Sequence, residues 1–160
     1  MSFRYEAHML DLVLASQVLE KIIISPNISE TLYCGYEVSN LFGIPDVVIA
    51  QVDGNILRYT YAIELKLSNW KRALEQAFRY RSFANYSYVV LDNAHVRPAV
   101  RNINEFQRKN IGLIGLSDSG ELFDYFKPEI KKPYSMQFSQ EISDIVFNGD
   151  KFIELEWIII

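Results

Sequence analysis

Residues 59–80, YTYAIELKLSNWKRALEQAFRY, join the pattern of a strand to the pattern of the helix that follows it. Strand side chains alternate between two faces, so the apolar residues at odd positions are expected on one face and Glu64 and Lys66 together on the other. A carboxylate and an ammonium in so apolar a strand carry a large desolvation cost unless each is paired or binds an ion. The Glu64–Lys66 pair is therefore the first candidate for a functional site.

Composition limits the classes of protein to consider. A chain of 160 residues, 49% of them hydrophobic, is expected to form one domain over residues 1–160. No run of eighteen apolar residues and no signal-peptide pattern occurs, which predicts a cytoplasmic protein without a membrane segment. One cysteine excludes an internal disulfide and a thiolate zinc cluster, and two histidines argue against a histidine-rich zinc site. If a metal binds, carboxylates should be its ligands.

Charge is unevenly distributed along the chain. The formal net charge is −4, yet residues 66–109 contain nine basic and three acidic residues. A locally cationic segment in an acidic protein is what a phosphate-binding face requires, although a solvated helix face gives the same count. Nucleic acid therefore remains a possible partner.

Periodicity and turn residues predict an alternation of helices and strands. The expected helices are 3–24, 69–85, 98–109 and 138–147. The expected strands are 32–39, 46–52, 56–67, 87–91, 111–116 and 122–126, with 152–160 as an edge strand or a docked tail. Asp53-Gly54 predicts a hairpin between the second and third strands. This order predicts an α/β protein in which helices flank a mixed central sheet.

The polar residues in this order of elements resemble the PD-(D/E)XK nucleases, the restriction-endonuclease-like superfamily. Pro45-Asp46, a hairpin and then Glu64-Leu65-Lys66 are similar to its signature, and the αβββαβ order is similar to its core. The resemblance covers about residues 3–116 and leaves 117–160 as an extension. It implies that Asp46 and Glu64 bind Mg²⁺ or Mn²⁺ and that Lys66 assists the attacking water. Carboxylate oxygens on strands suit such hard cations.

Further residues match less specific features of the superfamily. Gln76 and Tyr80 resemble the QxxxY element of RecB-like members, which implies contact with nucleic acid. Glu6 resembles an acidic residue that some members add to the metal site, with Glu37 as a competing candidate. The backbone carbonyl of Leu65 is a further possible metal ligand. Arg72 and Arg79, on the same helix as Gln76, are candidates for binding the nucleic-acid backbone.

Each of these residues also has a purely structural interpretation. A Glu-x-Lys pair in a strand is usually a surface charge pair, and an aspartate after proline is commonly a turn residue. A Gln-Tyr pair on an amphipathic helix often marks a half-buried boundary, and an acidic residue early in a helix complements the helix dipole. The combination in one order of elements favours the metal site.

The sequence thus predicts a magnesium-dependent nuclease acting on DNA, with a homodimer possible because the apolar carboxyl-terminal tail offers a surface to bury. One alternative is an inactive nuclease-fold module that binds DNA or a protein. Another is an interaction domain whose acidic surface binds a basic partner.

Overall fold

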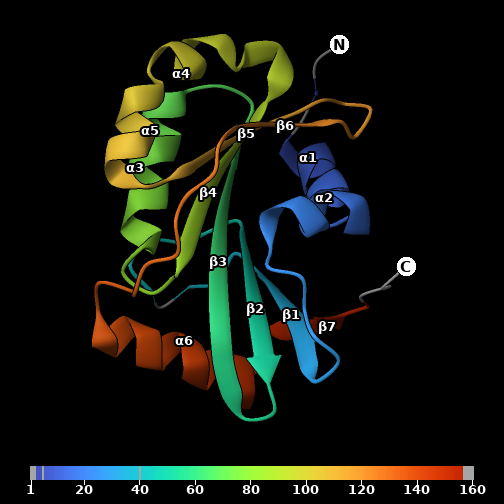
Figure 1. Ribbon diagram of the computed structural model, residues 1–160, viewed down its shortest axis with the longest axis vertical. Helices are drawn as coiled ribbons and strands as arrows, with labels where there is room; N and C mark the ends of the chain where they lie inside the picture. The colour runs from blue at the N-terminus through green and yellow to red at the C-terminus, as the bar shows by residue number, and fades with distance from the viewer. Residues whose placement is uncertain (1–2, 5, 40, 157–160) are drawn as a thin grey trace.

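The computed structural model describes residues 3–4, 6–39 and 41–156. The protein has an α/β fold built on one mixed sheet (Figure 1). The seven strands have the order β6-β5-β4-β3-β2-β1-β7. The strands are β1 (Glu30–Tyr36), β2 (Val47–Asp53), β3 (Ile56–Lys66), β4 (Tyr86–Asp92), β5 (Gly112–Leu116), β6 (Leu122–Phe126) and β7 (Phe152–Leu155). The helices are α1 (Glu6–Val13), α2 (Ser16–Ile22), α3 (Trp70–Tyr80), α4 (Arg97–Arg101), α5 (Ile103–Lys109) and α6 (Met136–Asn148), with a short 3-10 turn at Asn93–His95.

The centre of the sheet follows the predicted connections. β1, β2 and β3 form an antiparallel meander, and the predicted hairpin joins β2 to β3 with Gly54 in the left-handed conformation (φ 61°). α3 then carries the chain to β4, which pairs with β3 in parallel and places Lys66 opposite Leu91. The carboxyl ends of β3 and β4 therefore lie next to each other at one end of the sheet.

Two hydrophobic cores cover the two faces of the sheet. One contains side chains from α3, α4, α5 and α6, and the other contains side chains from α1 and α2. Figure 1 shows the corresponding arrangement, with α3, α4 and α5 on one side of the strands and α1 and α2 on the other. The predicted alternation in β3 is confirmed, because Ile63 and Leu65 face the α1–α2 core whereas Ala62 faces the α3 core. Glu64 consequently lies on the α3 side.

The amino-terminal segment forms two helices where the sequence predicts one over residues 3–24. α1 ends at Val13, and α2 begins after Ala15, whose backbone is extended (ψ 137°). Met9, Val13 and Leu19 nevertheless pack in the same core. Apolar periodicity reports which side chains are buried, and it continues across an interruption of the helical hydrogen bonds.

Three other predicted boundaries were wrong for related reasons. α3 ends at Tyr80 and not at residue 85, although the buried Phe83 and Ala84 continue its apolar pattern. The helix predicted over 98–109 is interrupted at Asn102 (φ −112°, ψ 30°). β1 spans 30–36 and not 32–39, because Glu37 adopts a positive φ (46°) that ends the strand.

The extension beyond residue 116 completes both edges of the sheet. β6 pairs with β5 and β7 pairs with β1, so of the two alternatives left open for residues 152–160, the edge strand is confirmed for residues 152–155. The rest of the predicted tail, residues 157–160, lies outside the described part of the chain. Within the described residues, no helix is both long enough and apolar enough to span a bilayer.

Candidate functional site

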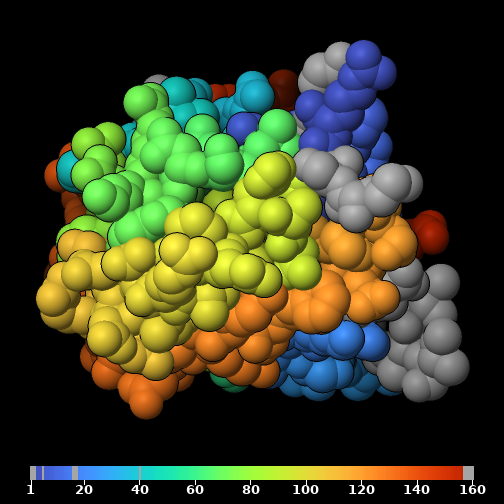
Figure 2. Space-filling view, turned by 90° about the horizontal axis from the view of Figure 1, so that it is seen from above, coloured from blue at the N-terminus to red at the C-terminus, as the bar shows by residue number. Residues whose placement is uncertain are grey.

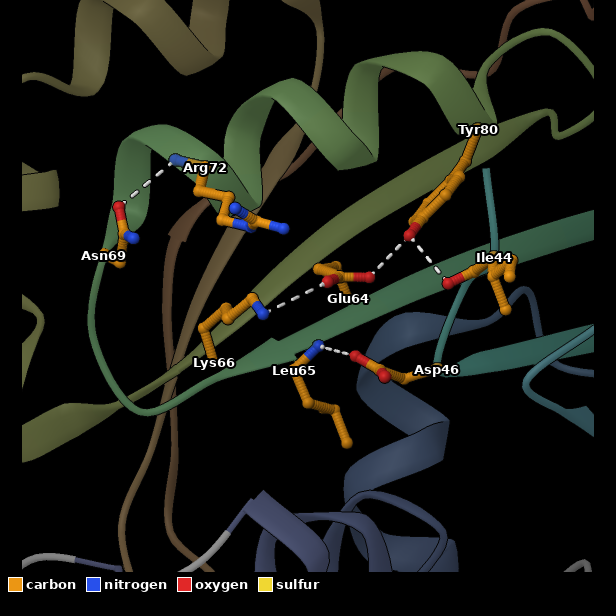
Figure 3. Close-up of polar contacts among 8 residues, drawn as sticks. All are labelled: Ile44, Asp46, Glu64, Leu65, Lys66, Asn69, Arg72 and Tyr80. Carbon is orange, nitrogen blue, oxygen red and sulfur yellow. Dashed lines mark hydrogen bonds and ion pairs between the residues drawn. The ribbon is translucent and has the colours of Figure 1, made fainter. Parts of the chain in front are cut away.

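Glu64 is a buried carboxylate held between two side chains of different chemistry. It lies near the end of β3 with only 3% of its surface exposed. The Tyr80 hydroxyl lies 2.6 Å from Glu64 Oε1, and Lys66 Nζ lies 3.9 Å from Glu64 Oε2. Figure 3 shows that Tyr80 descends from α3 whereas Glu64 and Lys66 rise from β3 to meet it. The predicted pairing of Glu64 with Lys66 is confirmed.

Burial makes the proton on Glu64 hard to remove. Desolvation raises the pKa of Glu64 from 4.5 to about 7, the Tyr80 hydroxyl lowers it, and the charge of Asp46 raises it further. Glu64 therefore carries a proton for a substantial fraction of the time at neutral pH. A carboxylate tuned in this way is typical of functional sites rather than of surface charge pairs.

Tyr80 is the side-chain hydrogen-bond donor to Glu64. The Tyr80 hydroxyl lies within bonding distance of two acceptors, Glu64 Oε1 and the Ile44 carbonyl oxygen at 3.0 Å. One hydroxyl has one proton and donates fully to only one acceptor. Donation to Glu64 favours the charged carboxylate, which is why the Tyr80 hydroxyl lowers the pKa of Glu64 against the effect of burial.

Asp46 lies beside the sheet at the start of β2. Its Oδ2 accepts a hydrogen bond of 2.7 Å from the peptide N–H of Leu65. A strand N–H points sideways in the plane of the sheet, so the Asp46 carboxylate lies near the level of the strands. Burial raises the pKa of Asp46, the Leu65 N–H lowers it, and the charge of Glu6 raises it.

A cavity of about 240 Å³ opens between α1 and the ends of β1 and β3. It is lined by Glu6, Ala7, Leu10, Tyr36, Glu37, Asp46 and Leu65. The structure thus brings Glu6 to Asp46 and places the competing candidate Glu37 there as well. The positive φ of Glu37 turns the chain at this point, and its N–H donates to the Asp46 carbonyl.

The donor set suits a hard divalent cation, although the ligands are not fully assembled. The charge of Asp46 opposes the ionisation of Glu64, and the charges of Glu6 and Glu37 oppose that of Asp46, so a cation would relieve this repulsion. Across the part of the chain that the structure describes, no three His, Cys, Asp or Glu side chains are grouped as a ready metal site. Leu65 contacts Asp46 through its N–H, and a ligand role for its carbonyl stays a prediction.

The predicted nucleic-acid residues of α3 lie in different environments. The side chain of Tyr80 is only 1% exposed, and its hydroxyl holds the Glu64 carboxylate by a hydrogen bond. Gln76 has a buried side-chain oxygen for which the described residues provide no hydrogen-bond partner. Arg72 and Arg79 are exposed, and the Arg79 guanidinium lies over the ring of Phe42. Contact of these residues with nucleic acid stays a prediction.

The carboxyl ends of the strands meet segments that are distant in the sequence. Figure 2 shows this end of the molecule, where α3 in green lies next to the α4–α5 segment in yellow, and α1 in blue is at the opposite corner of the view. The sequence did not indicate the Ile44 carbonyl, because a backbone acceptor has no residue type of its own. The pocket role of Tyr36 was also missed, since it is one of ten tyrosines with no distinguishing neighbour.

Comparisons with protein-family models, with curated proteins and with solved structures found no match for this chain. The resemblance to the PD-(D/E)XK nucleases therefore rests on the residues and on their arrangement alone.

Proposed function

We propose that this protein is a metal-dependent nuclease with a restriction-endonuclease-like core, hydrolysing phosphodiester bonds of DNA. The observation that carries the proposal is the position of Glu64. It is a buried carboxylate of raised pKa at the end of a central strand, next to the amine of Lys66 and close enough to Asp46 for that charge to raise its pKa. The antiparallel meander β1–β2–β3, followed by α3 and the parallel β4, supports the αβββαβ assignment.

Asp46 and Glu64 are the proposed ligands of Mg²⁺ or Mn²⁺, with Glu6 and the Leu65 carbonyl as further donors. When bound, such an ion acidifies a water and neutralises charge on the phosphate. The hydroxyl of Tyr80 fixes the orientation of Glu64 through its hydrogen bond to Oε1. Tyr80 is thus a positioning residue in this scheme.

Lys66 supplies the cationic group of the site. Its ammonium lies 3.9 Å from Glu64 and its side chain is 23% exposed, so it can reach a phosphate that enters from solvent. From there it orients the attacking water and offsets the negative charge that develops on the phosphoryl oxygens. Arg72 and Arg79, both exposed on α3, are proposed to bind the DNA backbone beside the site.

The alternative is an inactive module of the same fold that binds DNA or a protein. The observation in its favour is that, among the described residues, acidic side chains do not form a ready group of three.

Cleavage of labelled DNA in Mg²⁺ or Mn²⁺ tests the nuclease against the inactive module. Lys66→Ala is expected to lower the rate on the order of 100- to 1000-fold, the usual effect of losing one electrostatic contact to the reacting group. Lys71→Ala, an exposed lysine on the first turn of α3, is the matched control and should cleave like the wild type.

Metal binding provides a second measurement. Titration calorimetry with Mn²⁺ should show binding to the wild type and much weaker binding to Asp46→Asn and Glu64→Gln. A wild type that neither cleaves DNA nor binds the ion supports the inactive module. Cleavage that survives unchanged in Lys66→Ala contradicts the assigned role of that residue.

A further inference from the structure

Aromatic and cationic side chains alternate on the outer surface of α3 and the segments beside it. We call this surface the aromatic–cation strip and define it by Phe42, Phe78, Arg79, Arg81, Lys109 and Tyr134. Figure 1 shows the segments that contribute to it, with α5 beside α3 and the connection between β6 and α6 passing down next to them. None of these residues belongs to the buried carboxylate site.

Contacts within the strip link its rings to its cations. Lys109 Nζ lies 4.7 Å from the centre of the Phe78 ring, and the guanidinium of Arg81 lies 4.5 Å from the centre of the Tyr134 ring. The Phe78 and Tyr134 rings meet edge to face at 6.0 Å. A cation is attracted to the face of the aromatic ring beneath it. Here these contacts fix the rings at the surface.

The rings are accessible although they are large and apolar. The exposed fraction is 62% for Tyr134, 46% for Phe42 and 36% for Phe78. Exposed rings that are held by cations offer faces for stacking, together with positive charge for a phosphate backbone. The rings alone could bind a protein partner, but the cations between them favour an anionic partner.

Arg81 adds an independent observation. Its side chain is only 5% exposed, and it donates to the Tyr134 hydroxyl (2.7 Å) and the Lys109 carbonyl (3.3 Å). Its Nε is buried without a hydrogen-bond partner, and no carboxylate forms an ion pair with it among the residues that the structure describes. Burying an uncompensated cation is costly, and the result is a positive charge held beneath an exposed ring.

The strip begins next to the proposed catalytic site. Gly43 lies against Tyr80 and Arg79, since a Cβ at this glycine would approach the Tyr80 ring to 2.8 Å. Phe42 precedes this turn and Asp46 follows it. A strand that follows the rings of Phe78 and Phe42 is therefore led toward Asp46 and Glu64.

We propose that the aromatic–cation strip binds single-stranded DNA by stacking unpaired bases on its rings, and delivers that strand to the site, so that the substrate class is an unpaired strand or a single-stranded end. The inference rests on the proposed nuclease function for the delivery step alone. In a duplex the bases stack on one another, so protein rings cannot reach their faces. Every unpaired base exposes a face on which a protein ring can stack.

Binding of fluorescent oligonucleotides without divalent ions separates the strip from catalysis. The wild type is expected to bind single-stranded DNA more tightly than a duplex of the same length. Phe78→Ala and Tyr134→Leu are each expected to weaken single-strand binding by roughly 5- to 100-fold, the effect of losing one stacked base. Tyr134→Phe keeps the ring and should bind like the wild type.

One control and one further variant complete the design. Phe123→Ala on β6 removes a ring with the same 36% exposure as Phe78 but outside the strip, and it should leave binding unchanged. Arg79→Ala should reduce the salt slope of single-strand binding by about 0.7, the contribution of one phosphate contact.

Several outcomes would overturn the inference. These are equal or tighter binding of the duplex, ring variants that bind like the wild type, and tighter binding of RNA than of DNA by the same rings. Strip-dependent binding in a protein that cleaves nothing supports the strip and counts against the nuclease. Cleavage of duplex DNA alone, with strip variants that cleave like the wild type, supports the nuclease and counts against the strip.

Discussion

The neighbouring parallel strands β3 and β4 each end near a buried carboxylate, and the two carboxylates are accommodated in different ways. Asp92, at the end of β4, is fully buried, and its oxygens accept backbone N–H groups from Phe3 (2.8 Å) and Ala94 (3.0 Å). Glu64, at the end of β3, receives one side-chain hydroxyl and lies near the further negative charges of Asp46 and Glu6. Asp92 is compensated by the backbone, whereas Glu64 is in an environment that opposes its charge.

The difference shows that burial alone does not identify a functional carboxylate. Asp92 ties the amino-terminal segment to the end of β4, which is a structural role. The Tyr80 hydroxyl and the Lys66 ammonium favour the charged form of Glu64, but they offset its burial and the neighbouring negative charges only in part, so its pKa stays raised. A buried acid whose neighbours oppose its ionisation is the better candidate for binding a metal ion.

The largest expected effect on stability is that of Asp92→Ala. This change removes the two hydrogen bonds that the buried Asp92 side chain accepts from backbone N–H groups, so the free energy of unfolding should fall by about 4 kcal/mol. Urea denaturation measures the change. Glu64→Ala at pH 8 is the matched comparison and should destabilise far less, because it removes an opposed charge. A greater loss for Glu64→Ala would contradict the contrast between the two carboxylates.

A smaller effect is expected in the pH dependence of stability. The pKa of Glu64 is about 7 in the folded protein against 4.5 for an ordinary glutamate, so the folded state retains a proton that the unfolded state releases. The contribution of Glu64 to the free energy of unfolding should therefore be greatest below pH 4.5. It should fall by about 3 kcal/mol as the pH rises to 7. Glu64→Gln should lose this component in urea denaturation at several pH values. An unaltered pH profile would show that Glu64 titrates normally.

The smallest effect is expected for Tyr80→Phe. It removes the hydroxyl that lies against Glu64, so stability at pH 8 should fall by about 2 kcal/mol. The same hydroxyl lowers the pKa of Glu64, and its loss should raise that pKa above the wild-type value. NMR titration of the Glu64 carboxyl carbon measures the shift. A pKa that falls in this variant would mean that the hydroxyl does not favour the charged form.

Much of the central fold follows from the sequence. The β-branched run of β2, Asp53-Gly54 and the alternation in β3 place the hairpin and its faces correctly, because these are local properties of neighbouring residues. The predicted mixed sheet is also confirmed, since β4 pairs with β3 in parallel whereas β2 pairs with β3 in antiparallel fashion. Helix ends were less predictable, since the interruptions near Ala15 and Asn102 leave the apolar pattern intact.

The sequence by itself determined that Glu64 and Lys66 share one face of a strand, because alternation is a property of the backbone. Only the tertiary structure decided which charges surround them. The contacts of Glu64 with Tyr80, of Asp46 with the Leu65 N–H, and of Phe78 with Lys109 join segments that the chain separates. Burial and the electrostatic field at a residue are sums over neighbours in space, and those neighbours are fixed by packing.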